Sequence, residues 1–332
     1  MKQILFYAAV TDVSLFHTQK FYILEVEILR SLGYEVTLSN NYLDFFRLKY
    51  DIAYIFFYTK GILPALIARF RLKKVYFTGG IDDLDPDYAN KFRYKRQRLL
   101  FRLCRCLSKD CIIVSESDLK NVRNVYKNKL PSKLDLVYHA IKINDFSCNL
   151  EEKANNFVTI CWMESVRNVQ RKGIDISLQY FNYLLSFPKF NESIYFIIGK
   201  EGVGTEYLKS MIDEMGLTGK VFFTGAIDES MKIDYLRKSR YYFQMSRTEG
   251  FGLAALEALA AKCVIINSGK GGLKEVVGDS GILVDIGKFD NLIYDRIESF
   301  DQYILEKAHQ RILNNYDFNG RLRKIETILN RN

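Results

Sequence analysis

Two glutamates, Glu249 and Glu257, stand eight residues apart in the run 246–285. On a helix this spacing turns a side chain by only about 80°, so both carboxylates can face the same cleft. Ionised carboxylates accept hydrogen bonds from hydroxyl groups in pairs. Two glycines between them uncover the backbone, so the start of a helix can bind phosphate. The amides placed to do so are those of Gly250, Phe251, Gly252 and Leu253.

This run resembles the retaining GT-B glycosyltransferases of family 4, also called glycosyltransferases group 1, whose signature is a glutamate, seven residues and a second glutamate in an EGFG setting before an apolar helix. The likeness continues through 269–272, 274–278 and 281–284, about 40 contiguous residues. In that family the first glutamate contacts the donor sugar, and the second glutamate contacts the ribose hydroxyls. The glycine amides contact the diphosphate. The resemblance therefore implies these roles for Glu249, Glu257 and the amides of 250–253.

A second family feature lies upstream, where an arginine and a Lys-Gly pair neutralise the diphosphate. Lys172, followed by Gly173, matches the Lys-Gly position. Either Arg167, five residues earlier, or the adjacent Arg171 is the arginine. Fixed cations suit this chemistry because breaking a sugar–phosphate bond moves negative charge onto the leaving diphosphate. The resemblance implies that no metal or other cofactor is needed, with the nucleotide-diphosphate sugar as substrate.

Two further loops resemble donor-binding parts of the family. Gly199 follows an expected strand and resembles a glycine-rich phosphate loop. Ala226 and Ile227 follow another strand and resemble the segment whose backbone contacts the nucleobase. The Gly199 loop lacks the GxGxxG spacing and the later acidic residue of a nicotinamide site.

The likeness is weaker in residues 1–140, which we expect to bind the acceptor. The first strand is followed by Thr11, Asp12 and His17 in place of the usual paired glycines, so these residues are candidates for the acceptor side. Asp82 lies in a Gly-Gly-Ile-Asp run that resembles a family loop, which makes it a candidate catalytic residue for holding acceptor or sugar.

Three aspartates, Asp83, Asp85 and Asp87, form two Asp-x-Asp steps. Such oxygen ligands could hold Mg²⁺ or Mn²⁺ on a diphosphate. The second half of the chain already offers a phosphate site without a metal. A polar loop before the next helix is therefore the preferred interpretation, and no metal site is expected.

The elements that position these residues are predicted as alternating strands and amphipathic helices, which is typical of an α/β fold with parallel sheets. We expect two Rossmann-like doubly wound domains facing a cleft, at 1–145 and 155–315, with a polar linker near 142–156 and a C-terminal helix, 316–332, that crosses back to the first domain. The expected strands are 3–8, 35–38, 51–58, 74–78, 111–114 and 135–138, then 157–162, 194–198, 221–224, 241–245, 264–267 and 281–284.

The chain has 332 residues and a net charge of +9, and all the excess lies in residues 1–150, with 24 basic and 15 acidic side chains. The basic residues gather at 69–74 and along 91–109, interleaved with aromatic and aliphatic side chains. This pattern suits an anionic membrane surface. Nucleic acid would satisfy the same electrostatics, and a solvated helix face is an equally simple interpretation.

Six cysteines without metal-ligand spacing indicate buried thiols in a reducing compartment. The start of the chain predicts a strand and no leader peptide, so we expect a cytoplasmic protein, peripheral at the inner face of the membrane. The expected function is a retaining hexosyltransferase acting on a lipid-linked glycan in bacterial surface polysaccharide or lipopolysaccharide assembly. The alternatives are a soluble glycosyltransferase for a small metabolite or sugar phosphate, and a non-catalytic nucleotide-sugar or nucleic-acid-binding module. Nucleic acid is not an expected partner.

Overall fold

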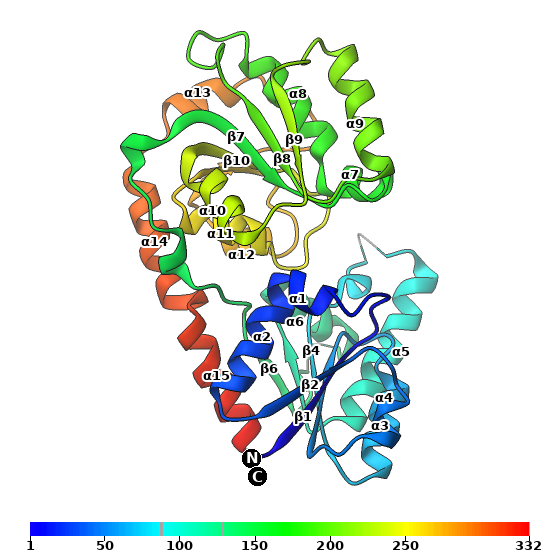
Figure 1. Cartoon of the computed structure of the whole chain (residues 1–332). Coiled ribbons are helices and arrows are strands. Elements are labelled where there is room, and N and C mark those ends of the chain that lie inside the picture. Colours follow the sequence, from blue (N-terminus) through cyan, green and yellow to red (C-terminus); the bar gives the residue numbers. More distant parts are fainter. Residues whose placement is uncertain (87–88, 128, 332) are drawn as a thin grey trace. The chain divides into compact units, whose positions relative to one another are not determined.

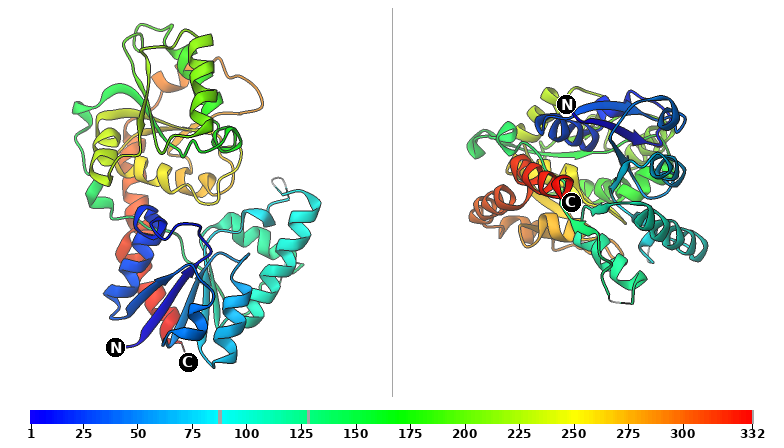
Figure 2. Two further views of the ribbon diagram at one scale, coloured as in Figure 1. Left: turned by 45° about the vertical axis from the view of Figure 1, so that its right-hand side comes forward. Right: turned by 90° about the horizontal axis from the view of Figure 1, so that it is seen from below.

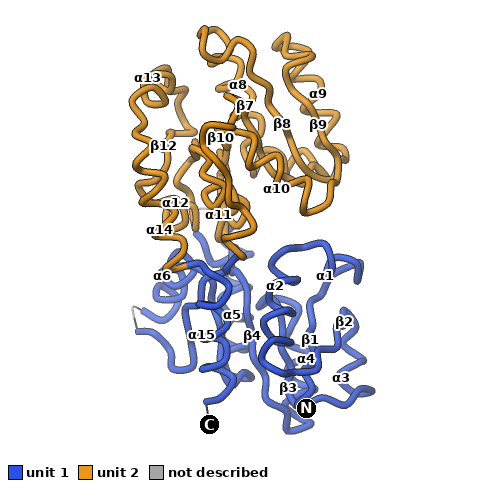
Figure 3. Tube along the Cα trace, turned by 60° about the vertical axis from the view of Figure 1, so that its left-hand side comes forward, with its two compact units in different colours: residues 1–141, 316–332 blue, residues 142–315 orange. Residues whose placement is uncertain are grey.

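The computed structural model describes residues 1–86, 89–127 and 129–331. The chain forms two compact units, shown in Figure 3: unit 1 comprises residues 1–141 and 316–332, and unit 2 comprises residues 142–315. The chain leaves unit 2 through α14 (Tyr303–Tyr316) and ends in unit 1 with α15 (Phe318–Asn330).

Unit 1 is built on a parallel six-stranded sheet with the order β2-β1-β3-β4-β5-β6 (Figure 1). Strand β3 has the sequence IAYIF, and all five residues are buried. Unbroken apolar runs of this kind are typical of parallel strands that are covered on both faces. The strands are β1 (Gln3–Ala8), β2 (Glu35–Ser39), β3 (Ile52–Phe56), β4 (Lys74–Thr78), β5 (Asp110–Ile113) and β6 (Leu134–Leu136).

Helices cover both faces of this sheet: α2 and α15 lie on one side, and α4 and α5 lie on the other (Figure 2). Asn90 caps the longest helix, α5, by accepting a hydrogen bond from the amide of Arg93 at 2.9 Å. Besides α15, the helices of unit 1 are α1 (Leu15–Thr18), α2 (Lys20–Ser31), α3 (Asp44–Arg47), α4 (Ile62–Phe70), η1 (Asp82–Leu84), α5 (Lys91–Leu107) and α6 (Glu116–Val125).

Unit 2 has a second parallel sheet, with the order β12-β11-β10-β7-β8-β9. Three strands lie on each side of the boundary between β7 and β10. On each side they follow chain order from this boundary to the edge of the sheet, which is the doubly wound Rossmann order. At this boundary Phe157 stacks on Tyr241 and on Phe243, with ring centroids 4.9 Å apart in both pairs. The strands are β7 (Ala154–Ile160), β8 (Tyr195–Ile198), β9 (Val221–Gly225), β10 (Ser239–Gln244), β11 (Val264–Asn267) and β12 (Gly281–Leu283).

The helices of unit 2 bury their apolar sides against this sheet. Leu178, Leu208 and Ile293 come from three different helices and pack into one core with Phe157. Besides α14, the helices are η2 (Ile143–Phe146), η3 (Leu150–Glu152), α7 (Val166–Lys172), α8 (Ile174–Leu184), α9 (Val203–Glu214), α10 (Glu229–Lys238), α11 (Leu253–Ala260), α12 (Leu273–Val277) and α13 (Ile293–Glu298).

All twelve expected strands are present, and the α/β class with two doubly wound sheets is confirmed. Several strand boundaries differ from the expectation by one to three residues. Strand β3 ends at Phe56, because Phe57 turns out of the strand with φ of 69°. Strand β7 begins at Ala154, inside the polar segment, where Asn156 Oδ1 accepts a hydrogen bond from the amide of Ile194 at 2.9 Å. Cys106 is also exposed, against the expectation of buried thiols, because it lies on the outer face of α5.

A buried ion pair ties α15 to α2 in unit 1. Arg321 Nε lies 2.7 Å from Glu25 Oε2, and Arg321 Nη1 donates to the carbonyls of Val137 and Tyr138 at 2.6 Å each. Both charged side chains are buried. Burial by itself would lower the pKa of Arg321, but the charge of Glu25 raises it. The end of the chain is thus held in unit 1 by compensated charges.

We expect Arg321→Met to destabilise unit 1 by about 3–5 kcal/mol, because it leaves the Glu25 carboxylate buried without its cation. Scanning calorimetry would show this as a lower melting temperature. The matched control is Arg323→Met, since Arg323 is exposed on the same helix. Adding Glu25→Leu to Arg321→Met should restore part of the loss. Equal melting temperatures for the two single variants would contradict the prediction.

Candidate active site at the carboxyl edge of the second sheet

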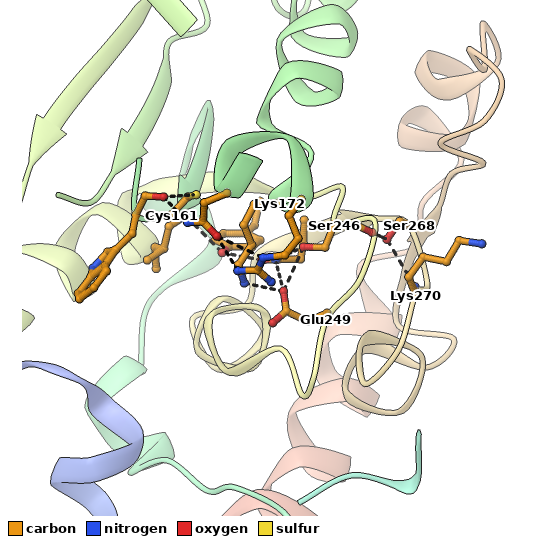
Figure 4. Close-up of polar contacts among 12 residues, drawn as sticks. Cys161, Lys172, Ser246, Glu249, Ser268 and Lys270 are labelled. Atoms are coloured by element: carbon orange, nitrogen blue, oxygen red, sulfur yellow. Dashed lines mark hydrogen bonds and ion pairs between the residues drawn. The ribbon is translucent and has the colours of Figure 1, made fainter. Parts of the chain in front are cut away.

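The sheet of unit 2 brings two loops together where β7 and β10 end. These strands are neighbours, so the segments that follow them, 161–165 and 245–252, leave the sheet side by side. Doubly wound sheets bind ligands at this point, because the connections run away to opposite sides and leave a crevice between them. Figure 4 shows the polar contacts that gather there.

The centre of the site is an ion pair between Lys172, the last residue of α7, and Glu249, in the loop after β10. The distance from Lys172 Nζ to Glu249 Oε2 is 2.7 Å, and the two side chains point toward each other (Figure 4). The same oxygen accepts hydrogen bonds from Gln244 Nε2 and Ser246 Oγ, both at 3.0 Å. Three donors, from the end of α7, the end of β10 and the loop after β10, therefore hold one carboxylate oxygen.

The surroundings keep the Glu249 carboxyl ionised. Burial alone would raise its pKa, but the charges of Lys172 and Arg171 and the hydrogen bonds from Lys172 and Ser246 outweigh burial and lower it. The ionised carboxylate can accept hydrogen bonds from hydroxyl groups. The site thus combines a fixed hydrogen-bond acceptor, the Glu249 carboxylate, with fixed cations.

Two close backbone approaches hold the loop that carries Glu249. Gly173 has φ of 68°, and a Cβ there would lie 1.9 Å from the carbonyl oxygen of Met245. Gly271 has φ of 57°, and a Cβ there would lie 2.0 Å from the carbonyl oxygen of Glu249. Only glycine fits these positions. The glycine that follows Lys172 therefore lets α7 approach the β10 loop closely enough for the ion pair to form.

Arg247 fastens the same loop to α7 and α8. Its guanidinium bonds Asp175 in two places, at 3.0 and 2.9 Å, and also donates to the carbonyl of Gln170. Its backbone amide donates to the carbonyl of Arg171 at 2.8 Å. The distance between the Lys172 helix and the Glu249 loop is therefore fixed by side-chain and backbone contacts.

The two candidate arginines occupy different positions on α7. The Arg171 guanidinium bonds Asn168 Oδ1 through Nε at 3.2 Å and Nη2 at 2.8 Å, and its charge lowers the pKa of Glu249. It also opposes the effect of burial on Cys161, whose pKa is raised to about 11. Arg167 lies one turn earlier and is exposed. The charge of Arg171 thus acts on Glu249, whereas the side chain of Arg167 is exposed.

The predicted phosphate-binding amides lie at the start of α11. Helix α11 begins at Leu253 with Gly252 as its N-cap, and Phe251 is buried beneath the loop. The loop also meets a later one, since the amide of Gly272 donates to the carbonyl of Glu249 at 2.8 Å. The backbone from Gly250 to Leu253 therefore stands directly beside the Lys172–Glu249 pair.

Glu257 lies one helical turn further along α11 and is almost fully buried, with 2% of its surface exposed. Its Oε2 lies 2.8 Å from the Nζ of Lys232 on α10, and Lys232 also pairs with Glu229 at 3.0 Å. Burial alone would lower the pKa of Lys232, but the two carboxylates raise it. Glu257 thus sits in an ion pair of its own.

The other donor-side candidates follow β8 and β9 at the same edge of the sheet. The amide of Gly199 donates to the carbonyl of Gly225 at 3.1 Å, so this amide joins two strand ends. Ala226 is exposed and Ile227 is half-buried directly after β9.

The acceptor-side candidates all belong to unit 1. Thr11, Asp12 and His17 are exposed after β1, and Asp12 accepts a hydrogen bond from the amide of Ser14 at 2.8 Å. His17 lines a groove of about 520 Å³ along α2. Asp82 is exposed in η1, after β4.

The aspartate run does not assemble a metal site in the described part of the chain. Asp83 pairs with Arg93 at 2.5 Å and Arg96 at 3.6 Å. Asp87 lies outside the described residues. Among the residues that the structure describes, no three His, Cys, Asp or Glu side chains gather in a way that could hold a metal ion.

Sequence reasoning did not identify Gln244, Ser246 and Asn168, which orient Glu249 and Arg171. One signal was available. Gln244 and Ser246 are polar and two residues apart at the end of a buried strand, where alternate positions share a face.

We expect Lys172→Met to lower the melting temperature most at neutral pH. In the native chain the pKa of Glu249 is lowered. The ion pair therefore contributes its full stability to the folded state above the ordinary carboxyl pKa of about 4.3. This contribution is lost as the pH falls through the lowered pKa. Without Lys172, burial raises that pKa, and the loss of about 1–3 kcal/mol at pH 7 shrinks toward pH 4 as Glu249 takes up a proton. Thermal unfolding from pH 4 to 8 measures this trend.

The control for this prediction is Lys172→Met combined with Glu249→Gln, which has no carboxyl group to titrate. The loss of melting temperature of this double variant, relative to the native chain, should change little with pH. A deficit of Lys172→Met that is the same at pH 4 and pH 7 would show that the pair does not control the charge of Glu249.

Comparisons with known proteins agree with this geometry. Residues 163–316 match the family model described as Glycosyl transferases group 1. The chain is 27% identical over 183 residues to the capsular polysaccharide biosynthesis glycosyltransferase CapH of Staphylococcus aureus, covering 54% of this chain and 48% of CapH. The match to an N-acetylgalactosamine-N,N'-diacetylbacillosaminyl-diphospho-undecaprenol 4-alpha-N-acetylgalactosaminyltransferase of Campylobacter jejuni is 24%, with the same coverage. The chain spans about half the length of the curated relatives it matches.

Solved structures share the fold along the whole chain. Anabaena Alr3699/HepE, crystallised in complex with UDP and glucose, superposes with a TM-score of 0.76 at 16% identity and covers 99% of both chains. This likeness shows the GT-B fold. The matched residues 163–316 cover most of unit 2 and contain the Lys172–Glu249 pair, the glycine loop and α11. Through residues 163–316 the chain is similar to the family of group 1 glycosyl transferases.

Proposed function

We propose that this protein is a retaining hexosyltransferase of glycosyltransferase family 4, which moves a sugar from a nucleotide-diphosphate donor to an acceptor hydroxyl. The observation that carries this proposal is the Lys172–Glu249 pair, beside the glycine-rich start of α11 at the point where β7 and β10 diverge. Cations, backbone amides and an ionised carboxylate in one place suit a ligand with both a diphosphate and hydroxyl groups.

In this proposal Glu249 accepts hydrogen bonds from the donor sugar, because its carboxyl is held ionised. Lys172 and Arg171 lie against the diphosphate, together with the amides of 250–253. Glu257, about one turn into the helix that follows the glycine loop, fixes the ribose hydroxyls.

The proposed chemistry is a front-face substitution at the anomeric carbon. The bond from this carbon to the diphosphate oxygen breaks, and the bond to the acceptor oxygen forms on the same face of the sugar. The acceptor proton passes to the departing phosphate oxygen. Negative charge grows on the diphosphate as the bond breaks, so fixed cations beside it stabilise the transition state more than the ground state.

We propose a lipid-linked glycan as acceptor, in bacterial surface polysaccharide or lipopolysaccharide assembly. The name of the Campylobacter relative specifies a diphospho-undecaprenol-linked acceptor. No helix in the described residues is both long and apolar enough to cross a bilayer. Access to a lipid-linked acceptor would therefore need a surface that lies on the membrane.

Helices α4 and α5 offer such a surface in unit 1. They pack against each other and expose apolar side chains on shared helix faces, including Phe70 (88% exposed) and Phe92 (73% exposed). Exposed basic residues surround them on α5: Lys91, Lys95, Arg96 and Arg98. We call these two helices the α4–α5 surface and propose that it binds anionic lipid at the cytoplasmic face, since apolar insertion and cationic contact act together there.

To test the donor site, hydrolysis of a panel of nucleotide-diphosphate sugars is measured with purified protein. We expect Glu249→Gln to reduce kcat by about 10²–10³-fold, the cost of removing one preorganised stabilising group. Arg171→Ala should lower kcat by a similar factor, whereas Arg167→Ala should retain the native kcat because Arg167 is exposed. Lys288→Ala is the control for a lost surface charge in unit 2. Unchanged hydrolysis in Glu249→Gln would refute the proposed site.

To test the membrane surface, sedimentation with vesicles of phosphatidylcholine and phosphatidylglycerol is measured. Replacing Lys91, Lys95 and Arg98 by glutamine should weaken binding about a hundredfold, because each cation near the headgroups contributes about 1 kcal/mol. Phe70→Ser with Phe92→Ser should weaken binding even in low salt. The control replaces the exposed unit 2 lysines 238, 274 and 288 by glutamine. Equal binding by the control and the α5 variant would exclude a specific α4–α5 contact.

A further inference from the structure

Unit 1 contains a small pocket that the donor site does not use. It has a volume of about 240 Å³ and lies where β3 and β4 end, covered on one side by α5. Parallel sheets bind ligands at this edge, because their loops gather there. The lining residues that matter for recognition are Phe57, Thr59, Asp82, Asp83, Arg93 and Gln97.

Gln97 is the unusual member of this lining. Its side chain is 2% exposed, and its Oε1 finds no hydrogen-bond partner among the described residues. Buried polar atoms are nearly always paired, so an unpaired amide oxygen beside a pocket indicates a missing donor. The last torsion of a glutamine side chain is soft. Oε1 can therefore turn to accept a hydrogen bond from a hydroxyl group in the pocket.

Phe57 contributes an apolar surface and stands in a strained position. Its φ of 69° lies in the left-handed region, which is a genuine outlier for a bulky residue. The backbone is held there by a hydrogen bond from the amide of Phe57 to the carbonyl of Thr78 at 2.8 Å. The ring remains 36% exposed. Strain of this kind gathers at ligand sites, where the surrounding structure sustains it.

The charges of the pocket argue against a phosphate ligand. Arg93 Nη2 lies 2.5 Å from Asp83 Oδ1, and its Nε lies 3.4 Å from Asp83 Oδ2, so Asp83 already compensates this cation. Asp82 adds a further carboxylate. Carboxylates and an amide oxygen accept hydrogen bonds, and a hydroxyl both donates and accepts. These groups suit a neutral ligand with many hydroxyl groups.

We propose that this pocket binds one sugar ring of the acceptor glycan, with Gln97, Thr59 and Asp82 on its hydroxyl groups and Phe57 against its apolar face. The proposal rests on the proposed function and deepens it by assigning the acceptor's chemical class to particular residues. The pocket is smaller than the roughly 300–1,000 Å³ of sites for drug-sized ligands, which fits a single ring.

Binding is tested directly, without catalysis, by ligand-observed NMR with the α- and β-methyl glycosides of glucose, galactose, mannose and N-acetylglucosamine. We expect the full chain to bind at least one of them. Gln97→Met, similar in size but without the amide, should weaken that binding about tenfold, the usual effect of a lost hydrogen bond to a ligand. Thr59→Val is a second variant in case Gln97→Met unfolds. Arg123→Met, exposed on α6 of the same unit, is the control and should bind normally.

The donor-site variant Glu249→Gln separates this inference from the proposed function, because it should lose nucleotide-sugar hydrolysis and keep glycoside binding. Hydrolysis by the native chain without glycoside binding would overturn the pocket proposal alone. Glycoside binding without hydrolysis would overturn the proposed function and leave the pocket assigned. Unchanged binding in folded Gln97→Met and Thr59→Val would also overturn the pocket proposal.

Discussion

The 2.7 Å ion pair between Lys172 and Glu249 is the interaction on which the candidate active site depends. Burial alone would raise the pKa of the Glu249 carboxyl, and the adjacent ammonium lowers it. The pair joins the loop after β10 to the end of α7, which is the connection that follows β7. It can form only because β7 and β10 are neighbours in the sheet although they are far apart in the chain. The order of the strands in the sheet therefore decides whether this ion pair can form.

The contacts around the pair maintain that geometry. Gly173 and Gly271 allow backbone approaches that no side chain would permit, and Arg247 bonds Asp175 across the same gap. None of these residues needs to touch a ligand. They prevent the cation and the carboxylate from separating when no ligand is present, so the site is organised before it binds. This is the arrangement expected where transition-state charge is stabilised by fixed groups.

Unit 1 differs from unit 2 in how it uses the same architecture. Its sheet is also parallel and doubly wound, but its carboxyl edge carries aspartates, a strained phenylalanine and a buried glutamine in place of a glycine-rich loop before a helix. Its outer helices α4 and α5 expose apolar and basic side chains together, whereas α15 is bound to α2 by the buried Arg321–Glu25 pair. In the proposed function the two units divide the chemistry, with anion binding in unit 2 and hydroxyl and surface contacts in unit 1.

The sequence by itself determined the strands, the fold class and the two residues at the centre of the site. Buried parallel strands are continuous apolar runs that can be read locally, and the Glu249 loop and Lys172–Gly173 are short motifs of distinctive composition. Only the tertiary structure separated Arg171 from the exposed Arg167, because both lie on one short helix and their difference is the direction they face relative to another loop. It also revealed the roles of Gln244, Ser246 and Gln97. Whether a polar side chain finds a hydrogen-bond partner depends on residues that folding brings together from distant parts of the chain. No local sequence pattern specifies these partners.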